Sequence, residues 1–168
     1  MQLIKINKQR YRRHLNITIA VCIVCLIVGS LGIAQLLIGI FPNQSGSHFH
    51  WNFLGVVVST VAIGLVLHRL RSHDFMREVV YVWNLKQALN KINRKMRPLQ
   101  VAATEGNESA LLALLFSCAG SRLLWQLDDN TLVIDELMTE QTRVDSLVNQ
   151  YNLHLDVNDY TDSILDQF

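Results

Sequence analysis

The longest uncharged stretch of the sequence runs from Ile17 to Phe41, 25 residues without Asp, Glu, Lys or Arg. As a helix it is about 37 Å long, enough to cross a hydrocarbon core of about 30 Å with some tilt. A cleaved signal peptide is the competing interpretation, because basic residues precede the stretch. However, the apolar core of a signal peptide is only about 7–15 residues long and ends at a small-residue cleavage site, which is missing here. The stretch is therefore predicted to be a retained transmembrane span.

A second apolar stretch, from Trp51 to Leu67, has 17 residues and reaches about 25 Å as a helix. A short polar loop without Lys or Arg separates the two stretches, which predicts an antiparallel hairpin over residues 15–70. Its spans are predicted at residues 15–41 and 49–70, with an outer loop at residues 42–48. A buried soluble hairpin is the alternative, because the second stretch is near the lower length limit for a span.

Basic residues lie on both flanks of this hairpin and are absent from its loop. Both termini are therefore predicted to face the cytoplasm, with residues 1–14 as a basic N-terminal segment. Each basic side chain near an anionic leaflet contributes about 1 kcal/mol to membrane binding. The expected partner of these residues is the anionic inner leaflet of the lipid bilayer. The predicted membrane-surface residues are Arg10, Arg12, Arg13, Arg69 and Arg71.

Small residues predict where the two spans touch, because they let two helix backbones approach closely. They are Gly29, Ser30, Gly32 and Ala34 in the first span, and Gly55, Ser59, Thr60 and Gly64 in the second. Gln35 is the most polar residue well inside the first span, and a hydrogen bond to Ser59 is predicted from their similar depths. The expected role of Gln35 is helix packing. Neither apolar stretch, Ile17 to Phe41 or Trp51 to Leu67, contains Asp, Glu, Lys or Arg, so a channel or transporter acting alone is not expected.

Residues 71–168 are predicted to form a cytoplasmic helical domain. The fold class is therefore all-α: a two-helix transmembrane hairpin followed by a bundle of about three helices. Apolar residues recur every three or four positions from Phe75 to Leu99, which predicts one helix that Pro98 ends or restarts. Asn107 is expected to cap the next helix, and a third follows the polar run 128–131. The tail from Leu153 is expected to fold back as a short strand or helix.

Charge is distributed unevenly along the chain. Residues 1–98 hold 13 Lys and Arg against 2 Asp and Glu, whereas residues 99–168 hold 2 against 12. The basic face of Lys86–Arg97 is expected to lie against the acidic later helices or against lipid headgroups. No aromatic residues interleave with these charges, so nucleic acid is not an expected partner.

His48 and His50 are the strongest candidates for chemistry. In an extended loop, side chains two residues apart project to the same side and can share a metal ion. A metal site normally has three or four protein ligands, and no Cys, Asp or Glu lies on that side of the membrane. Anchoring at the membrane interface is the alternative role, although a homo-oligomer would bring two such pairs together.

Other chemical motifs are weak or absent from the sequence. Cys22 and Cys25 form a C-x-x-C motif inside a span, where apolar surroundings make thiols inert. No phosphate-binding loop, G-x-S-x-G elbow or H-E-x-x-H motif occurs. No catalytic residue or cofactor is therefore predicted, and the protein is not expected to be an enzyme.

Four segments of the sequence are distinctive. They are Arg10-Tyr11-Arg12-Arg13-His14-Leu15-Asn16, Gly46-Ser47-His48-Phe49-His50-Trp51-Asn52, Val79-Val80-Tyr81-Val82-Trp83 and Leu124-Trp125-Gln126-Leu127-Asp128-Asp129-Asn130-Thr131. These segments resemble a family of bacterial inner-membrane proteins of unknown function, and the resemblance covers nearly the whole chain. It implies a multi-pass protein of the bacterial plasma membrane, and it transfers no activity, ligand or catalytic residue.

Together these features predict a membrane-anchored interaction module that acts as an adaptor, assembly factor or accessory subunit. Its expected partner is another membrane or membrane-associated protein, or a second copy of itself. Aromatic residues anchor many interfaces, so Tyr81, Trp83 and Trp125 are the interface candidates, with core packing as their alternative role. The alternative function is a membrane-bound sensor or metal-binding protein that uses His48 and His50.

Overall fold

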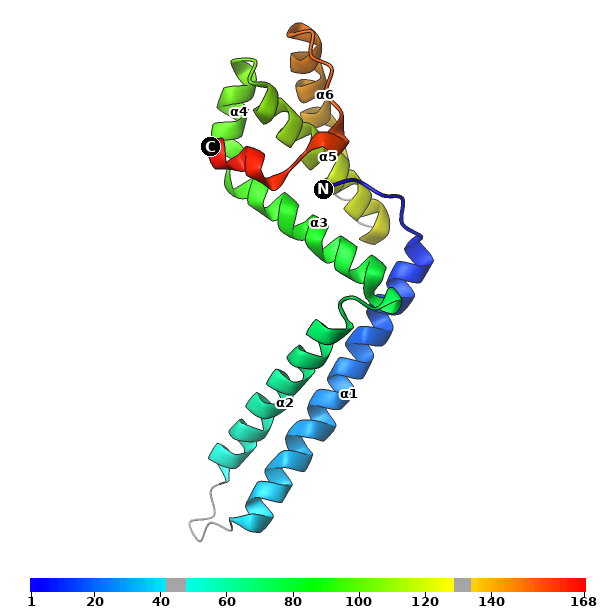
Figure 1. The fold of residues 1–168 in the computed structure, drawn as a ribbon, viewed down its shortest axis with the longest axis vertical. Coiled ribbons are helices and arrows are strands. Elements are labelled where there is room, and N and C mark those ends of the chain that lie inside the picture. The colour runs from blue at the N-terminus through cyan, green and yellow to red at the C-terminus, as the bar shows by residue number, and fades with distance from the viewer. Residues whose placement is uncertain (42–47, 129–133) are drawn as a thin grey trace. The chain divides into compact units, whose positions relative to one another are not determined.

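A computed structural model describes residues 1–41, 48–128 and 134–168, and every regular element in these ranges is a helix (Figure 1). The predicted all-α class is confirmed for this part of the chain. The chain divides into two compact units. Residues 9–80 form one, which we call the hairpin unit. Residues 1–8 and 81–168 form the other, which we call the domain unit.

The hairpin unit consists mainly of two antiparallel helices, α1 (Lys8–Ile40) and α2 (Phe49–Leu70) (Figure 1). α1 begins seven residues before the predicted span, so the basic N-terminal residues extend the same helix. The outer loop lies outside the described residues, apart from His48. After α2 the short 3-10 helix η1 (Asp74–Met76) leads into α3, which begins at Arg77.

Two pairs of small residues mark the closest approach of α1 and α2, as the sequence predicts. A Cβ atom added to Gly55 would lie 2.5 Å from the carbonyl oxygen of Ser30 and 3.2 Å from the backbone nitrogen of Ala34. A Cβ atom on Gly29 would lie 2.9 Å from Oγ of Ser59. Glycine at both positions therefore lets the two backbones come together without a steric clash.

The predicted hydrogen bond between Gln35 and Ser59 is wrong. Gln35 is exposed, whereas Oγ of Ser59 is buried against Gly29 without a hydrogen-bond partner among the described residues. Gln35 lies six positions after Gly29, and this spacing turns Gln35 away from the contact face of α1. Gly64 does not contribute to the contact either, since a Cβ atom there would meet nothing within 4 Å.

The domain unit contains most of α3 and all the later helices. They are α3 (Arg77–Arg94), α4 (Met96–Thr104), α5 (Glu108–Asp128), α6 (Ile134–Gln150), η2 (Val157–Asp159) and η3 (Asp162–Gln167). The single helix predicted up to Leu99 is interrupted at Lys95. Pro98 then falls in the first turn of α4, where a missing backbone N–H is tolerated. The tail folds back as two 3-10 helices, so the strand alternative is wrong for this segment.

The core of the domain unit is built around α5. Leu111, Leu114 and Phe116 of this helix are almost completely buried. The ring of Phe116 stacks on that of Tyr160, with centroids 4.1 Å apart and an interplanar angle of 19°. Burial raises the pKa of Tyr160, and the negative charge of Asp162 acts in the same direction. The tail therefore closes one side of the core with an aromatic residue that stays neutral.

The turn between α4 and α5 follows the predicted capping pattern. The backbone N–H of Ala110 donates to Oδ1 of Asn107 over 3.0 Å, which confirms Asn107 as the cap of α5. Gly106 has a φ of +81°, and a Cβ atom there would lie 2.7 Å from the ring of Tyr151. Both observations explain why glycine occupies this position.

The basic face of Lys86–Arg97 does contact acidic residues that come later in the chain. Nζ of Lys86 lies 3.0 Å from a carboxylate oxygen of Asp128, and Lys91 pairs with Asp162. The acidic partners are at the end of α5 and in η3, so the predicted charge contact is confirmed for these two pairs. All four side chains are partly exposed, so each pair contributes only about 0–1 kcal/mol.

The segment before α1 packs on the domain unit through Tyr81. The hydroxyl of Tyr81 donates to the carbonyl oxygen of Gln2 over 3.1 Å and accepts from the backbone N–H of Ile4 over 3.0 Å. The N-terminal amine of Met1 also donates to the carbonyl oxygen of Tyr160. Burial raises the pKa of Tyr81, so its hydroxyl keeps the proton that it donates. The segments that precede and follow the hairpin unit therefore both belong to the domain unit.

Candidate functional site

α1 and α2 expose an extensive apolar surface. Three helices among the described residues are long and apolar enough to cross a membrane: α1, α2 and α5. Only 6% of the apolar stretch of α1 and 11% of that of α2 is buried, against 50% for α5. Val28 and Leu36 of α1 and Leu65 of α2 are each about two-thirds exposed. The protein itself therefore leaves α1 and α2 largely uncovered, whereas it covers much of α5.

α5 is surrounded by other helices of the domain unit. It packs against α4, α6, η2 and η3, which precede and follow it in the chain. Its exposed face carries a charged residue, Arg122, near the middle of its C-terminal half. The surroundings of α5 are therefore those of a core helix in a small helical domain.

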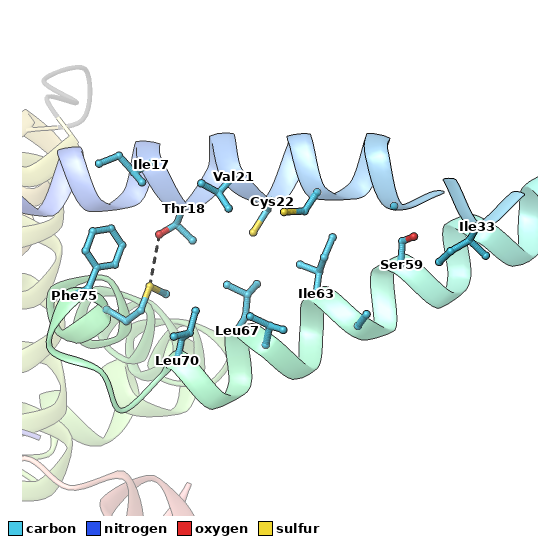
Figure 2. Close-up of a pocket in the computed structure, with 15 residues that line it drawn as sticks. Ile17, Thr18, Val21, Cys22, Ile33, Ser59, Ile63, Leu67, Leu70 and Phe75 are labelled. Carbon is cyan, nitrogen blue, oxygen red and sulfur yellow. Dashed lines mark hydrogen bonds between the residues drawn. The ribbon is translucent and has the colours of Figure 1, made fainter. Parts of the chain in front are cut away.

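A groove separates α1 and α2 at the end nearest η1. From the contact between Gly29 and Ser59 the two helices diverge, as Figure 2 shows, and leave a cavity of about 410 Å³. Apolar side chains of both helices line it together with Met76, and Phe75 lies at its wide end. The few polar atoms include the Thr18 hydroxyl, which donates to the carbonyl oxygen of His14 over 2.8 Å. Oγ of Ser59, which also lines the groove, has no hydrogen-bond partner among the described residues.

The base of the hairpin unit is held together by a charged and aromatic cluster. The ring of His14 stacks on that of Phe75, with centroids 4.2 Å apart. Nε of Arg10 lies 3.0 Å from one carboxylate oxygen of Glu78, and Nδ1 of His14 lies 3.6 Å from the other. The start of α1 is therefore tied to the segment that follows α2, and this fixes the wide end of the groove.

The arginines predicted to lie at the membrane surface have different environments. Arg10 is about half exposed and forms the ion pair with Glu78. Arg12 is half-buried, whereas Arg13, Arg69 and Arg71 are exposed. Arg10 and Arg13 belong to the start of α1 and Arg69 to the last turn of α2. Lipid binding by these residues stays a prediction.

The two candidate metal ligands are not in an extended loop. α2 begins at Phe49, so His48 immediately precedes the helix and His50 lies in its first turn, next to Trp51. Positions two residues apart on a helix do not face each other, so the expected same-side geometry is wrong. Among the described residues, no group of three or more His, Cys, Asp or Glu is arranged to hold a metal ion. Metal binding by His48 and His50 stays a prediction.

The three aromatic interface candidates differ in exposure. Trp83 on α3 is 62% exposed, Trp125 on α5 is half-buried, and Tyr81 is half-buried against the N-terminal segment. The anchoring role of Tyr81 was missed from the sequence, because its partners lie more than 75 positions away and leave no periodic signal. The groove was missed as well, because residues of two helices that are far apart in the chain line it together. Its residues Cys22 and Cys25 form the C-x-x-C motif of the sequence.

The fold defines a class of helical protein in which two long, exposed apolar helices precede a small packed helical domain. The chain belongs to the family described as protein of unknown function (DUF3087), whose model matches residues 1–165. The match covers nearly the whole chain, as the resemblance implies. No curated protein and no solved structure shows significant similarity to the chain.

Proposed function

We propose that the protein is an integral membrane protein, with α1 and α2 as its two spans. The observation that carries the proposal is the large apolar surface that these helices leave uncovered. Apolar patches of this size are rare on soluble monomers and mark contact with a membrane or another protein. A bilayer covers the apolar stretch of each helix, because each helix has at least the roughly 20 residues that are needed to cross it.

The composition of the domain unit supports a chain that crosses the membrane an even number of times. Residues 1–8, before the hairpin, and residues 81–168, after it, belong to the same compact unit. Both flanks of the hairpin therefore lie on one side of the membrane. A third span through α5 would place α4 and α6 on opposite sides, although both pack against α5 and against each other. We therefore assign α5 to the soluble domain.

The side on which this domain lies follows from charge. The flanks of the hairpin carry Arg10, Arg12, Arg13, Arg69 and Arg71, whereas the loop at residues 42–48 carries neither Lys nor Arg. The positive-inside rule places both flanks in the cytoplasm. The resemblance to bacterial inner-membrane proteins makes the plasma membrane of a bacterium the location that we propose.

At that surface the domain unit acts as an interaction module for another protein or for a second copy of the chain. Trp83 supports this role, because its indole is exposed on a helix whose neighbouring apolar residues Val82 and Leu85 are buried. Tryptophan is enriched among the residues that contribute most to binding energy at interfaces. An adaptor, assembly factor or accessory subunit is the kind of protein that this arrangement suits.

The topology is tested with single cysteines in a chain whose Cys22, Cys25 and Cys118 are replaced by Ala. In intact cells, a membrane-impermeant maleimide should label Phe49→Cys, because this residue is 75% exposed at the outer end of α2. Val101→Cys, which is 61% exposed on α4, should be labelled only after the membrane is opened. Labelling of Val101→Cys in intact cells would contradict the cytoplasmic placement. Labelling of neither variant after lysis would show that the assay itself had failed.

The interaction role is tested with a photo-crosslinking amino acid at position 83 in native membranes. We expect defined protein adducts at this position, identified by mass spectrometry, because the side chain points into solvent. The same amino acid at position 101 is the matched control, since Val101 is equally exposed on another helix. If position 83 gives no adduct beyond those at position 101, Trp83 is not the anchor of an interface.

A further inference from the structure

We propose that the groove between α1 and α2 binds one acyl chain of an anionic phospholipid, whose headgroup lies against Arg13 and Arg69. The proposal rests on the proposed function, because the groove faces lipid only if α1 and α2 span the bilayer. It goes further by assigning the groove a ligand of defined chemistry.

The groove is too small to enclose a partner helix. A helix about 10 Å in diameter has a cross-section of about 80 Å², so 410 Å³ accommodates only about one helical turn. The same volume falls within the range of about 300–1,000 Å³ that is typical of small-ligand sites. A single flexible alkyl chain is narrow enough to follow the space between the two helices.

Along α2 the groove is about as long as one leaflet is thick. The lining residues on α2 extend from Ser59 to Leu70, about 17 Å along the helix axis, and those on α1 extend from Ile17 to Ile33, about 24 Å. One leaflet of the hydrocarbon core is about 15 Å thick, half of about 30 Å. The groove narrows where Gly29 meets Ser59, so an acyl chain that enters from the wide end reaches about the middle of the bilayer.

The apolar lining alone does not favour one lipid over another, because every lipid tail is as apolar as leucine. Selectivity comes from the charges at the wide end. Arg13 lies one helical turn before the lining residue Ile17 on α1. Arg69 lies three residues after the lining residue Val66 on α2. Each arginine is therefore on the helix face that lines the groove. Both side chains are exposed, and neither forms an ion pair with a described residue.

The cluster beneath the groove favours an anion at this place. Glu78 is the half-buried acidic residue there, and its carboxylate is already paired with Arg10. The guanidinium groups of Arg13 and Arg69 are therefore available to a phosphate, to which arginine donates two parallel hydrogen bonds. An anionic headgroup adds net negative charge to a site that otherwise has an excess of positive charge.

The binding is tested with the full chain in nanodiscs of phosphatidylcholine that contain a small fraction of phosphatidylglycerol with a photoreactive acyl chain. Adducts are located by mass spectrometry of peptides. We expect adducts at groove residues, and we expect Ala62→Phe to lower their yield several-fold because it fills the groove. Ala20→Phe is the matched control, since Ala20 is exposed on α1 and does not line the groove.

Headgroup selectivity is tested by competition with unlabelled lipid. Phosphatidylglycerol should displace the groove adduct more effectively than phosphatidylcholine, and Arg13→Gln combined with Arg69→Gln should abolish the difference. Arg97→Gln, an exposed arginine of the domain unit, should leave the difference unchanged. Equal competition by both lipids in the unaltered protein would overturn the proposal and indicate ordinary boundary lipid.

The adduct positions separate this proposal from the proposed function. Adducts on the exposed face of α1, with none in the groove, would overturn the lipid site and leave the spans intact. Adducts on neither face would overturn the membrane placement itself. Equal groove labelling in the unaltered protein and in Ala62→Phe would also overturn the site, because a phenyl ring there must displace the chain.

Discussion

Phe116→Ala is expected to destabilise the domain unit by about 3–5 kcal/mol, the usual cost of truncating a fully buried phenylalanine. Phe116 has no exposed surface, and its ring stacks on that of Tyr160. The substitution removes this contact and leaves a cavity in the middle of α5. The effect is large because the domain unit is small, and proteins of this size are stabilised by only about 5–15 kcal/mol in total.

Hydrogen exchange of the full chain in nanodiscs measures this loss without interference from the hairpin unit. A loss of 3 kcal/mol corresponds to exchange about 100-fold faster in peptides of α5 and α6. Met138→Ala is the control, because Met138 is 53% exposed on α6 and its truncation should cost less than about 0.5 kcal/mol. Unchanged protection in Phe116→Ala would contradict the assignment of α5 as a core helix and would favour a third span.

Gly55→Leu is expected to force α1 and α2 apart. The Cβ atom alone would lie 2.5 Å from the carbonyl oxygen of Ser30, and this backbone atom cannot move without moving α1. Overpacking of this kind costs about 1–3 kcal/mol, occasionally more. The matched control on the same helix is Gly64→Leu, since nothing lies within 4 Å of a Cβ atom at that position.

The separation is measured between spin labels placed on the exposed faces of α1 and α2, and stability is measured by thermal unfolding in detergent. Gly55→Leu should lengthen the distance and lower the unfolding temperature, whereas Gly64→Leu should change neither. If both variants behave like the unaltered protein, α1 and α2 do not pack through Gly55. If both are equally destabilised, leucine itself is poorly tolerated in α2, and the contact is not the cause.

Local patterns predicted the helices well. An apolar stretch of 25 residues and a second of 17 define α1 and α2, because length and hydropathy depend only on residues close together in the chain. Spacings of three and four residues predicted the helices of the domain unit for the same reason. Asn107 was recognised as a cap because capping acts over three residues. The interruption at Lys95 was only partly foreseen, since Pro98 allows a helix either to end or to restart.

The sequence by itself thus determined an all-helical chain, two candidate spans, the small residues at which they meet and the charge asymmetry of its flanks. The tertiary structure decided which apolar helix is covered, since α5 resembles a span in composition and is a core helix only through its neighbours. It also decided that Gln35 faces outward, that Tyr81 holds Gln2 and Ile4, and that a groove opens between α1 and α2. These features depend on contacts between residues far apart in the chain, and no local periodicity encodes such contacts.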